Sequence, residues 1–191
     1  MATQRHGLAT AADIVDDRQE VVGGELVQKA SPSFGHGLTQ MALGGALSGF
    51  LGPGGSPARP GGWWLASEVE IELALHEVYL PDMAGWRIER MPEPRLDARP
   101  VRIAPDWVCE ILSPSTADRD LGHKQARYHA ARVGHYWVLE PMNRVLTVYR
   151  WEEAGYRPVL ATGAGAVVRA EPFDAIEVAL GDIFRVPPSA A

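Results

Sequence analysis

Two carboxylates and one lysine occupy positions where the surrounding pattern favours apolar side chains. Asp82 follows Pro81 in an apolar stretch, Glu110 interrupts the run WVCEIL, and Lys124 lies on the inner side of an expected helix. A buried carboxylate without a partner costs several kcal/mol. Glu110 must therefore meet a cation, a metal ion, a cluster of donors or a proton, and a buried ion pair and a metal site are both compatible with its position.

The stretch around Glu110 predicts a strand that is buried on both faces. Pro105 suits the first position of a strand, and residues 107–112 are apolar except for Glu110. Side chains alternate along a strand, so Asp106 and Glu110 share one face. Two acids are thus expected on one side of a hydrophobic strand.

A helix is predicted to follow this strand. The segment 113–116 ends the strand, and Asp118 or Asp120 can cap a helix that continues to about Arg132. Helical periodicity places Lys124 within the stripe that should face the sheet. The side chain of Lys124 is therefore expected to point inward.

Lysine is rare in this chain. Lys29 and Lys124 are the two lysines among eighteen basic residues, and the other sixteen are arginines. A lysine that faces acids in such a chain suggests a chemical reason, because its compact ammonium can hold a water or change its protonation state. The alternative is an Asp120–Lys124 pair on a solvated helix face.

Asp82, Glu110 and Lys124 on neighbouring elements of one sheet would form a site for a hard divalent cation. Two carboxylates can hold Mg²⁺ or Mn²⁺ while several water ligands remain. The cation binds a phosphate oxygen, and the ammonium stabilises charge or orients the attacking water. This combination predicts hydrolysis of phosphodiester bonds.

The first third of the chain predicts a leader, a hairpin and a helix. Residues 1–17 read as a flexible leader that ends in a short helical turn, and Gly23-Gly24 joins two alternating runs as a two-residue hairpin. Glu25 lies just after that turn. A helix capped by Ser31 or Ser33 follows and carries His36 in its first turn, where a histidine can be structural or catalytic.

Further elements continue the pattern of a mixed sheet. Residues 52–62 form a loop rich in glycine and proline, and strands are predicted over about 64–73 and 78–88, with Asp82 inside the second. After the central unit come three more strands, then an extended segment and a helical turn that close the chain.

Composition indicates one soluble domain. The 191 residues are 46% hydrophobic and 22% charged, and residues 18–187 are expected to form the domain. The single cysteine excludes an intramolecular disulfide and a cysteine-based zinc site. Neither a secretory signal nor a run long enough to cross a membrane is evident, so we expect a cytoplasmic protein that does not enter the membrane.

The formal net charge of −6 argues against broad neutralisation of phosphates. Five arginines between residues 87 and 102 form a local cationic stretch. A solvated loop of mixed charge is the alternative interpretation of those arginines.

The run from Pro105 to Pro141 closely resembles the Uma-two family, described as restriction endonucleases and placed in the PD-(D/E)XK nuclease superfamily. The resemblance extends from about Glu20, through GELV and His36, to GDIF near the end. It implies a restriction-endonuclease-like fold of mixed α and β structure, in which helices flank a mixed central sheet. Mg²⁺-dependent cleavage of DNA is the activity that it implies.

The resemblance also assigns site residues. Asp82 matches the motif aspartate and Glu110 the acid of the (D/E)XK element, both as metal ligands. The lysine two positions later is replaced by Leu112, and Lys124 on the following helix stands in its place. With less support, Glu25 resembles the family's N-terminal acid; His36 and Asp106 match recurrent positions without an assigned role.

Two functions follow from these observations. The first is a metal-dependent DNA endonuclease that acts as a homodimer so that both strands are cut. The second is a binding or assembly module that keeps the nuclease fold without efficient cleavage. In that module the acids and Lys124 would form a buried ion-pair network.

Overall fold

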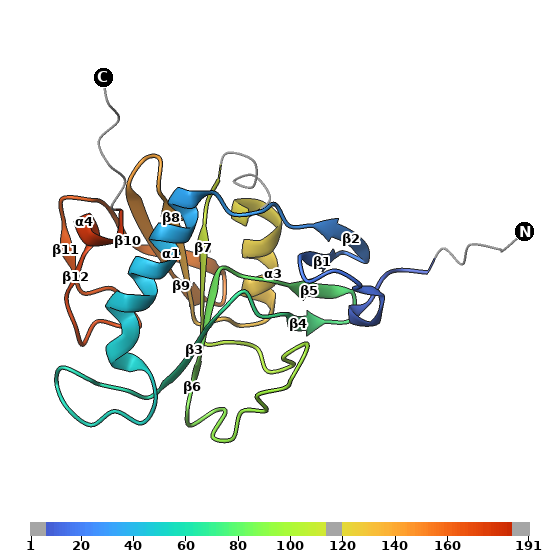
Figure 1. The fold of residues 1–191 in the computed structure, drawn as a ribbon, viewed down its shortest axis with the longest axis horizontal. Coiled ribbons are helices and arrows are strands. Elements are labelled where there is room, and N and C mark those ends of the chain that lie inside the picture. Colours follow the sequence, from blue (N-terminus) through green and yellow to red (C-terminus); the bar gives the residue numbers. More distant parts are fainter. Residues whose placement is uncertain (1–6, 114–119, 185–191) are drawn as a thin grey trace, which may run out of the picture.

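A six-stranded sheet runs through the centre of the molecule (Figure 1), in the computed structural model that describes residues 7–113 and 120–184. Its strand order is β10-β9-β8-β7-β6-β3, and only β7 and β8 pair in parallel. The strands are β3 (Trp63–Ser67), β6 (Met83–Arg87), β7 (Trp107–Ile111), β8 (His135–Glu140), β9 (Val145–Glu152) and β10 (Gly155–Gly163).

Strand β7 is buried on both faces, as its apolar run predicts. Trp107, Cys109 and Ile111 pack with the helix α1 (Phe34–Leu47), whereas Val108 and Leu112 pack with Tyr128 of the helix α3 (Gln125–Ala130). The two helices thus cover opposite faces of the sheet. Every residue of β7, including Glu110, is buried.

A second, four-stranded sheet lies beside the first and was not expected. Its order is β2-β1-β5-β4, with β1 (Gln19–Val22), β2 (Glu25–Gln28), β4 (Ile71–Ala74) and β5 (Glu77–Tyr79). The two long strands predicted over 64–73 and 78–88 are therefore wrong, because each is broken and its halves belong to different sheets. The breaks fall around Glu68, whose φ of 53° ends an extended path, and at Pro81.

The N-terminal hairpin and its helix form as predicted. Gly23 and Gly24 both have positive φ, which a two-residue turn of this kind requires, and β1 pairs with β2 on either side. Ser33 caps α1 by accepting a hydrogen bond from the His36 N–H at 3.2 Å. Part of the predicted leader contacts the domain, since the Ala9 N–H donates to the Gly24 carbonyl.

The helix after β7 is shorter than predicted and irregular. Its first turn, Asp120–Lys124, is π-helical, and α3 then ends at Ala130 because Arg132 adopts a positive φ. The proposed cap residue Asp118 and the side chain of Asp120 lie outside the described residues. Lys124 nevertheless points inward and is 1% exposed, as its helical position predicts.

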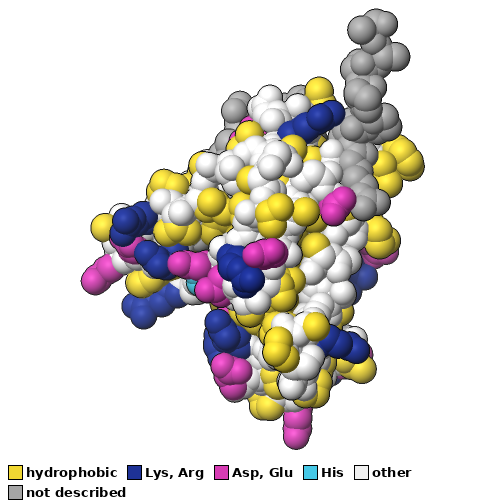
Figure 2. Space-filling view, turned by 90° about the vertical axis from the view of Figure 1, so that its left-hand side faces the viewer, with side chains coloured by type: hydrophobic (Ala, Val, Ile, Leu, Met, Phe, Trp, Pro, Cys, Tyr) yellow, Lys and Arg dark blue, Asp and Glu magenta, His cyan; other side chains and the backbone are white. Residues whose placement is uncertain are grey.

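The chain closes with β11 (Val167–Val168), β12 (Val178–Ala179) and the short helix α4 (Leu180–Ile183), which packs against α1. Figure 2 shows the side of the molecule that carries these elements, where hydrophobic side chains alternate with charged side chains of both signs. Among the described residues, no helix combines the length and apolar character needed to span a membrane.

Candidate active site

Asp82 lies at the junction between the two sheets, directly before β6 rather than inside a strand. Its Oδ2 accepts the Ile111 N–H at 2.6 Å, and its Oδ1 lies 2.8 Å from Lys29 Nζ and 3.3 Å from His36 Nε2. The Gln40 amide of α1 donates to the Asp82 carbonyl at 2.7 Å. Strand β7, helix α1 and the N-terminal hairpin thus together fix this carboxylate, which is 2% exposed.

The Glu110 side chain points toward helix α3. Its Oε1 accepts hydrogen bonds from Lys124 Nζ at 3.1 Å and from the Tyr128 hydroxyl at 2.6 Å. Lys124 and Tyr128 are four residues apart on the π-helical turn and α3, so both reach the same carboxylate. The predicted proximity of Glu110 and Lys124 is therefore observed.

A third acid, Glu20, completes the environment of Lys124. Its Oε1 lies 3.0 Å from Lys124 Nζ and accepts the Leu80 N–H at 2.9 Å, and its side chain is fully buried. Glu25, the N-terminal acid suggested from sequence, instead lies on exposed β2 opposite Val22. The acid that the hairpin brings to the site is Glu20, five residues earlier.

Lys29, the other lysine of the chain, is also part of the site. Its Nζ donates to Glu68 Oε2 at 2.9 Å, to the Leu80 carbonyl at 2.8 Å and to Asp82 Oδ1 at 2.8 Å. This position of Lys29 was not predicted from the sequence. The scarcity of lysine, which drew attention to Lys124, is the signal that could have identified it.

Of the two remaining candidates, His36 and Asp106, only His36 lies in the site. His36 lies in the site, since its Nε2 is near Asp82 Oδ1 and its side chain is 10% exposed. Asp106 lies at the opposite end of β7, where it accepts hydrogen bonds from the Arg87 N–H at 2.8 Å and from Arg90 at 2.7 Å. Asp106 therefore anchors the loop before β7.

A cavity of about 30 Å³ opens among these residues. It is lined by Lys29, Ser31, Pro32, Ser33, His36, Asp82, Glu110, Ile111, Ser113 and Lys124. Its volume suits one or two waters or a single ion and is too small for a nucleotide. A larger ligand could contact these residues only from outside the cavity.

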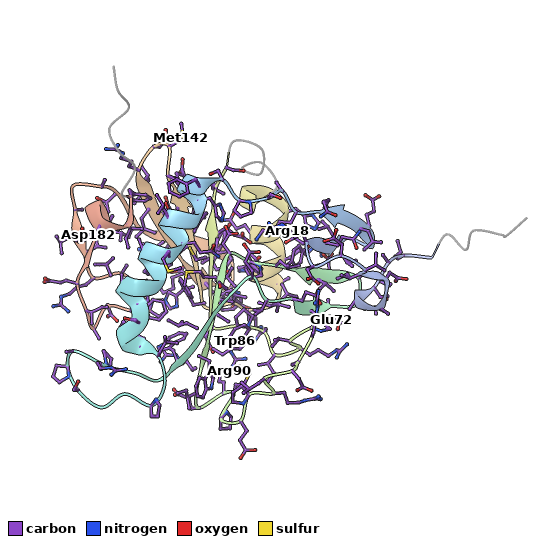
Figure 3. The ribbon with its side chains drawn as sticks, in the orientation of Figure 1. Arg18, Glu72, Trp86, Arg90, Met142 and Asp182 are labelled. Carbon is purple, nitrogen blue, oxygen red and sulfur yellow. The ribbon has the colours of Figure 1, made fainter. Side chains whose placement is uncertain are left out.

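Buried charges of both signs meet around this cavity. Among the described residues, the carboxylates of Glu20, Asp82 and Glu110 face the two ammonium groups of Lys29 and Lys124. Glu68 and Arg18 also lie close, 3.8 Å apart, and offset each other; Figure 3 labels Arg18 near the centre of the molecule. Among these described residues, the three carboxylates outnumber the two ammonium groups.

The protonation states in the site follow from these contacts. Burial raises the pKa of Asp82, but the adjacent His36 and the charge of Lys29 outweigh it, so the pKa lies well below its usual range. Burial lowers the pKa of Lys29, yet the charges of Asp82, Glu110 and Glu68 bring it above its ordinary value. Burial raises the pKa of the Tyr128 hydroxyl, which keeps it a donor to Glu110.

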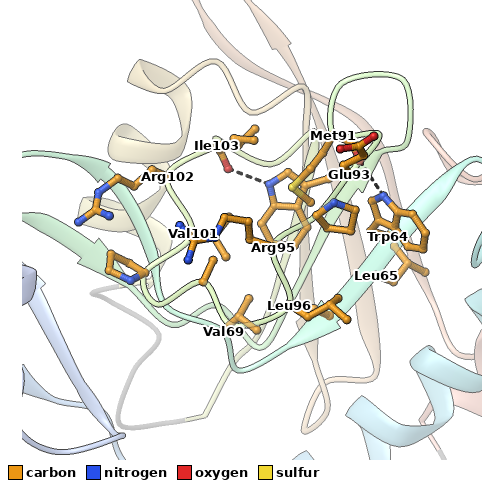
Figure 4. A pocket seen from close by; sticks show the side chains of 15 residues that line it. Trp64, Leu65, Val69, Met91, Glu93, Arg95, Leu96, Val101, Arg102 and Ile103 are labelled. Carbon is orange, nitrogen blue, oxygen red and sulfur yellow. Dashed lines mark hydrogen bonds between the residues drawn. The ribbon is translucent and has the colours of Figure 1, made fainter.

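A larger pocket lies elsewhere, beneath the loop 89–104 (Figure 4). Its volume is about 500 Å³ and its lining is mostly apolar, with the indole N–H of Trp64 donating to the Met91 carbonyl and that of Trp86 to the Ile103 carbonyl. The acids and lysines described above do not line it. Of these two pockets, the small polar cavity is therefore the one lined by the candidate acids and lysines.

The arginines of this loop have partners within the chain, which agrees with a solvated loop of mixed charge. Arg87 lies over the Trp63 ring, and four others pair with acids. These pairs are Arg90–Asp106, Arg95–Asp97, Arg99–Glu70 and Arg102–Glu72. Much of the positive charge of this stretch is thus matched by nearby carboxylates.

Comparison with known proteins identifies the family of the chain. Residues 11–181 match the model of the family Uma2, described as "Putative restriction endonuclease". The chain belongs to the Uma2 family. No curated protein matches the chain.

The fold of this Uma2 chain is that of a solved structure. A crystal structure from Anabaena variabilis, described as a putative nuclease belonging to DUF820, is similar with a TM-score of 0.73 and 19% identity. The similarity covers 92% of this chain and 97% of the other. The restriction-endonuclease-like fold predicted from sequence, a mixed sheet flanked by helices, is therefore confirmed.

Proposed function

We propose that the protein is a Mg²⁺-dependent endonuclease that hydrolyses phosphodiester bonds in DNA, with Mn²⁺ able to replace Mg²⁺. Membership of the Uma2 family and the nuclease fold support the reaction class. The observation that carries the proposal is the convergence of Asp82, Glu110 and Lys124 on one small buried cavity.

The residues around the cavity fit a divalent cation. Asp82 and Glu110 are the carboxylates that would hold it, because carboxylate oxygens are ligands that Mg²⁺ and Mn²⁺ prefer. When bound, the ion supplies Lewis acidity toward a phosphate oxygen and lowers the pKa of water.

The side chains of the chain would position the reacting groups. Lys124 holds a fixed positive charge beside Glu110, where it can orient a water or stabilise negative charge that develops on phosphate. Glu20 and Tyr128 restrain Lys124 and Glu110, and the Ile111 N–H restrains Asp82. Such restraint keeps the groups in place before the reaction.

One observation favours the second candidate, a nuclease-fold module without efficient cleavage. Asp82 and Glu110 each already contact an ammonium group, and His36 Nε2 lies 3.3 Å from Asp82 Oδ1. In that module the network would serve stability alone.

Thermal unfolding with and without metal separates the two candidates. We expect millimolar Mg²⁺ or Mn²⁺ to raise the Tm of the wild type relative to EDTA, and Asp82→Asn and Glu110→Gln to lose this increase. Glu77→Gln is the matched control, since Glu77 is buried but binds Tyr79 and Arg127 outside the cavity. A wild type whose Tm ignores both metals would favour the module.

Cleavage is then assayed on plasmid and linear DNA. The wild type is expected to convert supercoiled DNA to nicked and linear forms in Mg²⁺, whereas Asp82→Asn is not. Loss of the metal response together with unchanged cleavage would contradict the assignment of these ligands.

A further inference from the structure

Lys29 is held in the manner of a bound cation. Its ammonium meets three oxygens, Glu68 Oε2, the Leu80 carbonyl and Asp82 Oδ1, at 2.8–2.9 Å. These acceptors match its three N–H donors. The side chain is 7% exposed, so water contributes little to holding the charge.

The groups around this ammonium are those that ordinarily bind a divalent ion. His36, Glu68 and Asp82 each offer one ligand atom, and these atoms lie within 4.8 Å of one another. Lys29 Nζ contacts two of the three, and His36 Nε2 approaches the same Asp82 oxygen at 3.3 Å. The positive charge of the lysine thus fills a donor set suited to a metal.

This position adjoins the proposed Mg²⁺ site. Asp82 belongs both to the Lys29 cluster and to the cavity it shares with Glu110. In nucleases that use two metal ions, the ions lie about 3.5–4 Å apart and act on both sides of the phosphate. Here Asp82 would stand between an ion on the Glu110 side and the ammonium on the Glu68 side.

We propose that the Lys29 ammonium takes the place of a second divalent cation, so that the site binds one metal ion. This inference rests on the proposed nuclease function. The tethered charge cannot dissociate, and it holds Asp82 Oδ1 at 2.8 Å. Lys29 is therefore a positioning residue that acts through Asp82.

The choice of lysine over arginine agrees with this role. An ammonium is a compact point charge that can stand where an ion would, whereas a guanidinium is planar and needs a wider set of acceptors. The chain has sixteen arginines, yet lysine occupies both buried cationic positions of the site.

Counting bound Mn²⁺ tests the inference. Free Mn²⁺ is measured by electron paramagnetic resonance during titration of the wild type, Lys29→Met and Lys29→Met/His36→Ala. We expect one ion in the wild type, two in Lys29→Met because His36, Glu68 and Asp82 become available, and one again in the double variant. Glu77→Gln should bind one ion, as the wild type does.

The number of bound ions distinguishes the role of Lys29 from the metal site itself. Two ions in the wild type, or one in a folded Lys29→Met, would overturn the role of Lys29 and leave the nuclease proposal standing. No ion in any variant would overturn the metal site itself, and the role of Lys29 with it. An ion in Lys29→Met but none in the wild type would show that Lys29 excludes every metal.

Folding of the variants is checked by circular dichroism. If Lys29→Met does not fold, Lys29→Gln keeps a hydrogen-bond donor without the charge and is titrated instead. The wild-type count stands independently of both variants.

Discussion

Each lysine of the chain bridges two carboxylates at the candidate site. Lys29 joins Glu68 to Asp82, and Lys124 joins Glu20 to Glu110. Buried charges of this kind are costly to separate, because removal of one partner leaves the other desolvated and unpaired. The consequences can be tested one residue at a time.

The two acids of the N-terminal hairpin should respond very differently to loss of charge. Glu20→Gln weakens the contact with Lys124 and is expected to reduce the free energy of unfolding by about 1–3 kcal/mol. Glu25→Gln, on exposed β2, should change it by less than about 0.5 kcal/mol. Urea unfolding measures both, and equal effects would contradict the placement of Glu20 in the site.

Loss of Lys124 should be more damaging than loss of either acid partner. Lys124→Met leaves Glu20 and Glu110 without their shared cation, and we expect a loss of about 3–5 kcal/mol in metal-free buffer. The matched surface control is Arg157→Met, whose pair with Glu152 is exposed. In the double variant Glu20→Gln/Lys124→Met, part of the loss should be recovered, and strict additivity would argue against coupling.

At the scale of elements, the site depends on the passage of the chain from the four-stranded sheet into the six-stranded sheet. Val21 of β1 pairs with Val78 of β5, and this pairing carries Glu20 to the entrance of β6, where Asp82 begins the central sheet. Helix α1 covers one face of β7 and α3 the other, and each delivers one polar side chain, His36 or Tyr128, to an acid. Strand β7 alone would restrain Asp82 only through the Ile111 N–H.

His135 of β8 contacts Glu171, which lies before β12, and its titration is expected to lower the free energy of unfolding in acid. Burial lowers the pKa of His135, and the Glu171 carboxylate, 3.3 Å away, offsets only part of this. Below the unfolded pKa of about 6.5 the unfolded chain binds more protons, so stability is complete above that pH and falls as the pH drops toward the folded pKa. His135→Gln should flatten the decline measured by urea unfolding between about pH 7 and pH 5; an unchanged slope would contradict this assignment.

Sequence reasoning located the elements whose signals are local. An acid inside the apolar run of β7 and an inward lysine on the next helix are legible from periodicity, and both lie where predicted. The alternation in the hairpin is compatible with either Glu20 or Glu25 at the site. Only its pairing with β5 decides between them, and that pairing joins residues far apart in the chain.

Local sequence patterns also could not predict that the chain passes from one sheet to the other within these segments. Residues 64–73 alternate as one strand would, and the break at Glu68 depends on a left-handed backbone conformation for which a glutamate gives no signal. Lys29 has the composition signal of Lys124 but lies at the end of a short strand, where no helical or strand face indicates its partners.

At the scale of the whole molecule, the proposed nuclease has one candidate site per chain, and two copies would provide one site for each DNA strand. We propose that the active form is a homodimer, and sedimentation equilibrium should give twice the monomer mass at micromolar concentration. A monomer that only nicks DNA would contradict the dimer while leaving the single-site chemistry intact.

The accessibility of Cys109 to thiol reagents can report how often the central sheet opens. The thiol is fully buried in β7 between Met83 and Trp137, and burial, with the charges of Asp82 and Glu110, raises its pKa. A thiol reagent can label it only in molecules whose central strand has transiently separated. The labelling rate therefore measures how often the candidate site comes apart, and millimolar Mg²⁺ should slow it if the ion binds the closed form.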